Sequence, residues 1–213
     1  MKVLKIEDIK SIIGQIKTIV HNHQNTLMEL DGVMGDGDLG FTMTKAFDAA
    51  GEEAEKSEEK IPGKFFLRTG MIIAKTSPST MGTLVATGFM KGGKAIEAFE
   101  DIGPEELALF FEQFVQSIMD RGKSVPGNKT IVDTLLPAAR ALRLSAGDPL
   151  VTGITSARDA ALKGLKESTM MKAQHGRAAY YQENSIGKQD GGATVGTYII
   201  QGFYQHITSG RNH

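Results

Sequence analysis

The stretch GPEELALFFEQFVQSIMDRG, residues 103–122, carries the clearest folding signal in the chain. Its large apolar side chains recur three and four positions apart, which places them along one side of an α-helix, and acidic residues stand at its start. The apolar positions are Leu107, Phe110, Phe111, Phe114, Ile118 and Met119. The pattern predicts an amphipathic helix that buries one face.

The same spacing continues along the rest of the chain. Residues 9–31 predict one long helix that ends close to Asp31, and a second helix is expected to begin near Thr42. Further helices are predicted within residues 64–76, 77–100, 125–147, 148–169 and 191–207. No run of alternating β-branched residues lies between turn signals, so no sheet is expected. We therefore predict an all-α fold, a single domain over residues 1–213 built from about eight antiparallel amphipathic helices.

Composition limits the classes of function. The 24 basic and 25 acidic side chains nearly cancel, so no overall field would recruit nucleic acid or an anionic membrane. No cysteine occurs, which excludes disulfides, thiolate metal sites and cysteine nucleophiles. Residues 1–17 mix charges into their apolar residues and resemble neither a signal peptide nor a membrane span. These features predict a cytoplasmic protein without a membrane span.

Three aspartates and four glycines crowd into LDGVMGDGDLGFTM, residues 30–43. Gly35, Gly37 and Gly40 match the spacing of a dinucleotide-binding turn, but the intervening aspartates would repel a pyrophosphate and the residues upstream predict a helix rather than a strand. An EF-hand is excluded as well, because Phe41 stands where that loop requires glycine. The stretch calls for another explanation.

A divalent cation would explain this acidic loop. The flexible glycines allow the carboxylates of Asp31, Asp36 and Asp38 to converge, and without a counter-charge they would repel one another. Oxygen ligands without histidine or cysteine favour a hard ion, and carboxylates combined with phosphate oxygens are typical of Mg²⁺. The alternative is a solvated acidic turn in which Asp36 or Asp38 caps a helix.

Three other polar segments are candidates for anion binding. Gly176-Arg177 and Asp190–Gly192 flank a loop that leads into a helix, where N–H groups and a guanidinium could hold phosphate. Hydroxyl groups stand at another helix start, at Thr76, Ser77, Ser79 and Thr80. A backbone-lined slot could form around Gly122 and Pro126-Gly127. Each segment alone also fits an ordinary cap or turn.

No serine or histidine nucleophile and no base for a substrate hydroxyl is evident, so the residues suit holding a nucleotide better than completing catalysis alone. Taken together, LD....GDGD.G, RGKSVPGNKTIVDTLLPA and GRAAYYQENSIGKQDGGAT resemble, in order and separation, the nucleotide-binding L subunit of bacterial dihydroxyacetone (glycerone) kinases. The resemblance covers nearly the whole chain. It implies a barrel of eight antiparallel helices that binds ADP or ATP as a coenzyme with two Mg²⁺ ions in the loops at one end.

The resemblance also implies roles for individual residues. Asp31, Asp36 and Asp38 match the magnesium ligands, and Arg177 matches a catalytic residue that contacts the nucleotide. The other positions matching nucleotide contacts are Leu39, Gly40, Phe41, Thr42, Thr76, Ser77, Gly122, Ile131, Asp190, Gly191 and Gly192. The implied partners are a K subunit that holds the ketone substrate and the phosphoryl carrier M subunit of the phosphotransferase system, which recharges the ADP.

Two departures from the family pattern indicate a divergent paralogue. Leu39 and Thr42 stand where the family usually has histidine and asparagine, and the short TSPSTM, residues 76–81, replaces a glycine-rich loop. These changes keep open a non-catalytic nucleotide-binding regulator or assembly subunit. A stand-alone kinase or nucleotide hydrolase is a third alternative.

Overall fold

The computed structural model describes residues 2–209, and its regular structure within that range is helical apart from one isolated antiparallel bridge between Leu4 and Ile102. The α-helices are α1 (Ile6–Asn22), α2 (Gln24–Met34), α3 (Leu39–Lys56), α4 (Pro62–Thr76), α5 (Thr80–Ala95), α6 (Pro104–Gly122), α7 (Val132–Leu144), α8 (Leu150–Ser168) and α9 (Gly191–Ser209). A 3₁₀ segment, η1 (Arg177–Ser185), lies between α8 and α9. The predicted all-α class is confirmed.

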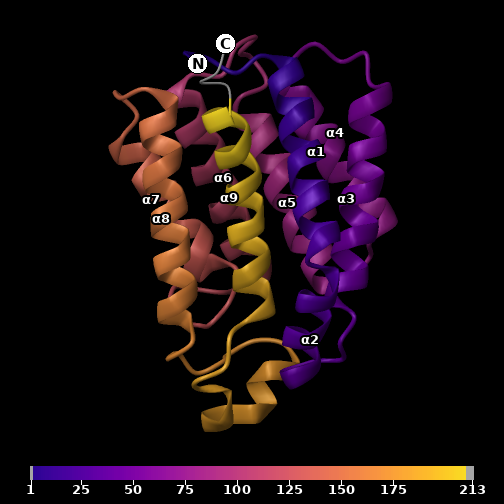
Figure 1. Ribbon diagram of the computed structural model, residues 1–213, viewed down its shortest axis with the longest axis vertical. Coiled ribbons are helices and arrows are strands. Elements are labelled where there is room, and N and C mark those ends of the chain that lie inside the picture. The colour runs from indigo at the N-terminus through magenta and orange to yellow at the C-terminus, as the bar shows by residue number, and fades with distance from the viewer. Residues whose placement is uncertain (1, 210–213) are drawn as a thin grey trace.

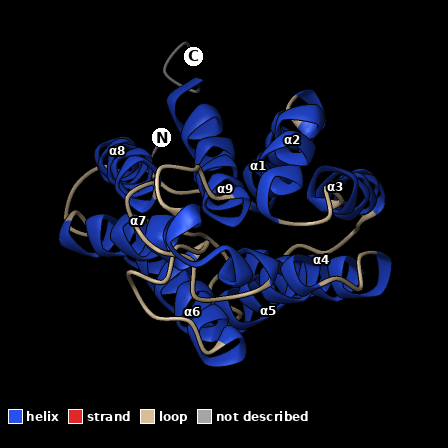
Figure 2. Cartoon of the chain, turned by 90° about the horizontal axis from the view of Figure 1, so that it is seen from below, coloured by secondary structure: helices blue, strands red, loops and turns tan. Residues whose placement is uncertain are grey.

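Eight of these helices form a closed ring. In the order α1, α3, α4, α5, α6, α7, α8 and α9, each helix packs against the next, and α9 packs against α1 to complete the circuit. Figure 2 views the molecule from below, down the axis of the ring. Figure 1 shows the helices running alternately up and down, with α2 set apart at the lower end. Every second connection therefore lies at the lower end, and the connections between them lie at the upper end.

The first predicted helix is divided in two. The structure ends α1 at Asn22 and begins α2 at Gln24, and the backbone N–H of His23 between them bonds back to the carbonyls of Ile19 and Val20. Residues 21–26 are polar, so no apolar side chain there holds a straight helix against the core. The break lets α2 turn away from the ring axis and carry Asp31 to the lower end.

Aromatic side chains fill the middle of the ring. The centroid of the aromatic ring of Phe110 on α6 lies 4.4 Å from that of Phe66 on α4, 5.1 Å from that of Phe111 and 6.1 Å from that of Phe203 on α9. All four side chains are at most 1% exposed. Phe110 also lies 6.2 Å from Phe89 on α5, so the apolar stripe of residues 103–122 faces three other helices, as its period predicts.

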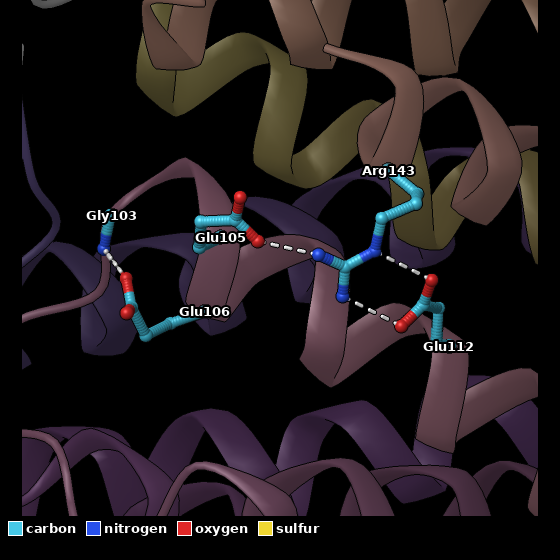
Figure 3. A network of polar contacts seen from close by, with 5 residues as sticks. All are labelled: Gly103, Glu105, Glu106, Glu112 and Arg143. Atoms are coloured by element: carbon cyan, nitrogen blue, oxygen red, sulfur yellow. Dashed lines mark hydrogen bonds and ion pairs between the residues drawn. The ribbon is translucent and has the colours of Figure 1, made fainter. Parts of the chain in front are cut away.

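A surface ion network joins α6 to α7 (Figure 3). Arg143 binds Glu112 through two hydrogen bonds of 2.8 and 2.7 Å and also pairs with Glu105. The hydrogen bonds from Arg143 lower the pKa of Glu112. Because the side chains of Arg143 and Glu112 are 38% and 36% exposed, solvent screens the pair, and we expect it to stabilise the fold by no more than about 1 kcal/mol.

Two glycines on α8 give a matched prediction about helix packing. An added Cβ at Gly164 would collide with the Asp133 carbonyl on α7, whereas at Gly153 the nearest atom would be 3.6 Å away. We expect Gly164→Ala to lower the free energy of unfolding by about 1–3 kcal/mol through overpacking. Gly153→Ala should raise it by about 0.5–1 kcal/mol, because alanine loses less backbone entropy in a helix.

Urea denaturation of the two variants and the wild type measures this difference. Equal stability of the Gly164→Ala and Gly153→Ala proteins would show that α7 and α8 do not approach as closely as the structure has them.

Candidate functional site

The four connections at the lower end surround one cavity of about 550 Å³. They are the turn between α2 and α3, residues 77–79 before α5, residues 123–131 before α7, and residues 169–190 before α9. The lining includes the apolar side chains of Met34, Leu39, Met81, Leu84 and Ile131. It also includes carboxylates, hydroxyls, a guanidinium and an ammonium, so the cavity suits a ligand with an apolar part and a charged part.

The three loop aspartates meet at the edge of this cavity. Asp31, in the last turn of α2, and Asp36 and Asp38, just before α3, each offer a carboxylate oxygen, and these oxygens lie within 4.8 Å of one another. Gly35 permits the approach, because a Cβ there would collide with the Asp31 carboxylate. Gly37 turns the chain with a φ of 75°, a conformation that favours glycine.

The charges of this acidic cluster act on each other. Partial desolvation raises the pKa of Asp38, the carboxylates of Asp36 and Asp31 raise it further, and Arg177 opposes them. Arg177 Nη1 lies 2.8 Å from Asp36 Oδ2, and the Leu39 N–H donates to Asp31 Oδ2 at 3.4 Å. Three carboxylates with one guanidinium beside them keep a net negative charge, and oxygen donors of this kind are the ligands that Mg²⁺ prefers, so these residues fit a hard cation.

The start of α9 forms another part of the wall. Asp190 caps this helix, since its Oδ2 accepts a hydrogen bond of 2.7 Å from the Ala193 N–H. Desolvation raises the pKa of Asp190 from 3.8 to about 6, against the hydrogen bond from Ala193 and the charge of Lys129. Gly191 and Gly192 let α9 approach closely: a Cβ at these positions would lie 2.6 Å from Leu39 Cδ2 and 2.7 Å from Met81 Cε.

Most of the site residues proposed from the sequence line the cavity. They are Asp31, Asp36, Asp38, Leu39, Thr42, Ile131, Arg177, Asp190, Gly191 and Gly192. Gly40, Phe41, Thr76, Ser77 and Gly122 are not among the lining residues.

The residues outside the lining have other surroundings. A Cβ at Gly40 would collide with the Gln24 carbonyl, so this glycine allows α2 and α3 to pack closely. Phe41 is 61% exposed. The Thr76 hydroxyl donates to the Ile72 carbonyl, and the buried Ser77 hydroxyl donates to the Thr42 carbonyl at 3.0 Å. Gly122 lies behind Leu84: a Cβ there would be 3.3 Å from Leu84 Cδ2.

The helix predicted within residues 77–100 begins later than expected, at Thr80. Ser79 is the N-cap of α5, with its hydroxyl accepting from the Gly82 N–H, and Pro78, Ser79 and Thr80 line the cavity. Ser79 and Thr80 were among the hydroxyl groups predicted from the sequence to stand at this helix start. Thr76 and Ser77, which the family resemblance matched to nucleotide contacts, lie instead at the end of α4.

Two titratable lining residues, Lys129 and His175, were absent from the residues proposed from the sequence. Lys129 is 2% exposed, and its Nζ donates to the carbonyls of Ser168 and Thr169. His175 precedes Arg177 by two positions, and its Nε2 lies 3.1 Å from Asn128 Oδ1. Only its place after the glycine turn in PGNKT singles out Lys129 in the sequence, because its partners lie about 40 positions further along the chain.

The raised pKa of Asp190 predicts how stability changes with pH. In the native state the Asp190 carboxyl keeps its proton up to about pH 6, whereas the unfolded chain releases it near pH 3.8. The contribution of Asp190 to the free energy of unfolding of the wild type is therefore present at low pH and is lost as the pH rises through about 6. We expect Asp190→Asn, which keeps a capping side chain, to gain stability relative to wild type across this window. The shift from 3.8 to about 6 bounds the gain at roughly 3 kcal/mol.

Denaturation of both proteins between pH 4 and 7.5 measures the gain. A stability difference that stays constant with pH would contradict the assignment to Asp190.

The fold and the site together define a class of protein: a closed ring of antiparallel helices with a cavity at one end that can hold cations and anions. The family model described as the DAK2 domain matches residues 33–205. The chain belongs to this family and is a DhaL-type member of it. In the part of the chain that the structure describes, every helix is too short or too polar to cross a bilayer.

Two relatives resemble the chain over most of its length. One is the PEP-dependent dihydroxyacetone kinase, ADP-binding subunit DhaL, of Escherichia coli K12, which is 32% identical over 177 residues, 82% of this chain and 84% of the relative. The other is PEP-dependent dihydroxyacetone kinase 1, ADP-binding subunit DhaL, of Listeria innocua, which is 30% identical over 186 residues, 87% of this chain and 89% of the relative.

Solved structures support the same fold. The chain superposes on the dihydroxyacetone kinase of C. freundii with a TM-score of 0.71 at 19% identity, both for its native form and for its complex with AMP-PNP and Mg²⁺. The match covers 92% of this chain and 34% of the native-form kinase chain, so this chain spans about a third of that protein.

Proposed function

We propose that this chain, acting as a single domain over residues 1–213, is the nucleotide-binding subunit of a dihydroxyacetone-type kinase and carries ADP or ATP with Mg²⁺ in the lower-end cavity. The observation that carries the proposal is the convergence of Asp31, Asp36 and Asp38 beside Arg177 and the start of α9. The relatives named as ADP-binding subunits support it.

The acidic cluster would hold the magnesium ions, two of them by the family resemblance. Bound Mg²⁺ neutralises charge on the phosphate oxygens, which favours transfer of the γ-phosphoryl group. Asp31, Asp36 and Asp38 supply carboxylate oxygens from one side, while Arg177, which pairs with Asp36, stands where its guanidinium can bind a phosphate. The apolar side chains of Ile131 and Met81 give the base a surface to pack on.

The acceptor substrate would be held elsewhere. By the family resemblance, a small hydroxyketone presented by a K subunit would complete the site, and an M subunit would recharge the ADP. Exposed apolar side chains from the lower-end elements support docking of a partner there. They include Val33, Phe41, Val125, Met170 and Tyr180, each at least 45% exposed.

Calorimetric titration with ADP in the presence of Mg²⁺ tests nucleotide binding directly, and the absence of heat with the folded wild type would refute the proposal. A second assay adds cognate K and M subunits and follows phosphorylation of dihydroxyacetone. Nucleotide binding without phosphoryl transfer in that assay favours the alternative, a nucleotide-binding regulator. Leu39 favours this alternative, because it packs an apolar side chain against Gly191 at the cavity wall.

A further inference from the structure

Lys129 combines three unusual properties. It has a φ of 60°, a backbone conformation that side chains other than glycine rarely adopt, it is only 2% exposed, and it lines the cavity. A strained backbone and a buried lysine both destabilise a fold unless the surroundings compensate for them. The contacts of the side chain therefore indicate why a lysine stands here.

The ammonium group binds the end of α8. Nζ donates to the Ser168 carbonyl at 2.9 Å and to the Thr169 carbonyl at 3.1 Å. These groups lie at the C-terminal end of a helix, where a positive charge is favourable. The Thr169 carbonyl also accepts the Gly187 N–H at 2.7 Å, so the same oxygen joins Lys129 to the segment that leads into α9.

The charges of two carboxylates act on the ammonium group. Burial lowers the pKa of Lys129, and the charges of Asp190 and Asp133 oppose that change. Asp133 in turn accepts the Gly127 N–H at 2.6 Å and the Thr130 N–H at 2.7 Å, which fixes the loop on both sides of Lys129. The side chain thus joins the loop before α7 to the end of α8, where the Thr169 carbonyl also holds the segment that leads into α9.

We propose that Lys129 is a positioning residue for the bound nucleotide: its side chain ties the cavity wall formed by Thr130 and Ile131 to the end of α8 and, through the Thr169 carbonyl that also accepts the Gly187 N–H, to the segment that leads into α9. This role rests on the proposed function. The acidic cluster lies on α2 and the turn before α3, outside the three segments that Lys129 joins. Loss of the lysine side chain should therefore weaken nucleotide binding and spare cation binding.

Lys123 provides a matched control in the same loop. It also has a positive φ, 52°, but its side chain is exposed and does not line the cavity. The experiment compares Lys129→Met, Lys129→Gly and Lys123→Met with the wild type. Lys129→Gly relieves the backbone strain while removing the ammonium group, so it separates a role for the side chain from a role for the turn.

Each protein is titrated with ADP in the presence of Mg²⁺ by calorimetry, and with Mn²⁺ alone by electron paramagnetic resonance. Both Lys129 variants should bind ADP about tenfold more weakly or worse, as expected for two lost charged hydrogen bonds. Their Mn²⁺ affinity should stay within about twofold of wild type, since the acidic cluster is intact. Lys123→Met should match the wild type in both titrations.

Wild-type ADP affinity in Lys129→Gly would overturn the proposal, because the lysine would then serve only the turn. Equal losses of ADP and Mn²⁺ binding in both variants would overturn it too, because the lysine would then support the whole cavity. Hydrogen exchange without nucleotide separates this test from that of the proposed function: amides of residues 130–132 and 190–194 should exchange faster in Lys129→Met. Unchanged exchange there would refute the positioning role whatever ligand the cavity takes.

Discussion

Replacing Asp36 and Asp38 together by alanine is expected to abolish ADP binding in the presence of Mg²⁺ while the helical ring stays folded. The two carboxylates supply two of the three converging oxygen donors, and loss of even one ligand should cost several kcal/mol of binding, by analogy with breaking a buried charge pair at about 3–5 kcal/mol. Since both side chains are exposed and repel Asp31, their removal should leave the unfolding midpoint unchanged or slightly higher.

Calorimetry and thermal denaturation of the double variant check the two halves of this expectation. Asp48→Ala is a suitable control, because Asp48 is a partly exposed aspartate on α3 that does not line the cavity. Chelation of Mg²⁺ by EDTA should weaken ADP binding by the wild type in the same way. Undiminished binding by the double variant would eliminate the acidic cluster as the cation site.

Phe110→Ala is expected to destabilise the fold by about 3–5 kcal/mol, a large fraction of the stability of an ordinary domain. Phe110 is fully buried, and its ring lies within 6.2 Å of the rings of five other phenylalanines from α4, α5, α6 and α9. Truncation would leave a void that the surrounding helices cannot fill without moving together.

Guanidinium denaturation gives the free energy of unfolding. Phe99→Ala serves as the control because Phe99 is 39% exposed, and its loss should cost less than about 1 kcal/mol. A small effect of Phe110→Ala, similar to that of the control, would mean that the centre of the helical ring is less tightly packed than the distances between the phenylalanine side chains imply.

The helices were predictable because each has its own apolar period. The sequence could not show that α9 returns to α1, since ring closure depends on contacts between residues far apart in the chain, such as Gly202 against Ile16. It also missed the break at His23, because the apolar period continues at Leu27 on the far side of the polar run. Local pattern therefore predicted the elements, and tertiary contacts decided their order in space.

The same distinction applies to the candidate site. The acidic cluster was predictable, because its three aspartates lie within eight positions and the glycines between them allow the approach. Thr76 and Ser77 were assigned to a helix start, but the structure ends α4 there, because the hydroxyl of Ser79 rather than of Ser77 caps α5. Nucleotide binding by the lining residues is the prediction that the titrations test.

The alternating direction of the helices has a practical consequence for protein engineering. The bends at residues 57–61, 96–103 and 145–149 lie opposite the cavity, and Gly147 and Asp148 are exposed there. A reporter domain or an epitope inserted between those two residues would project from the end of the molecule opposite the cavity. The chain thus offers an attachment point for tethering or imaging that leaves ligand entry unobstructed.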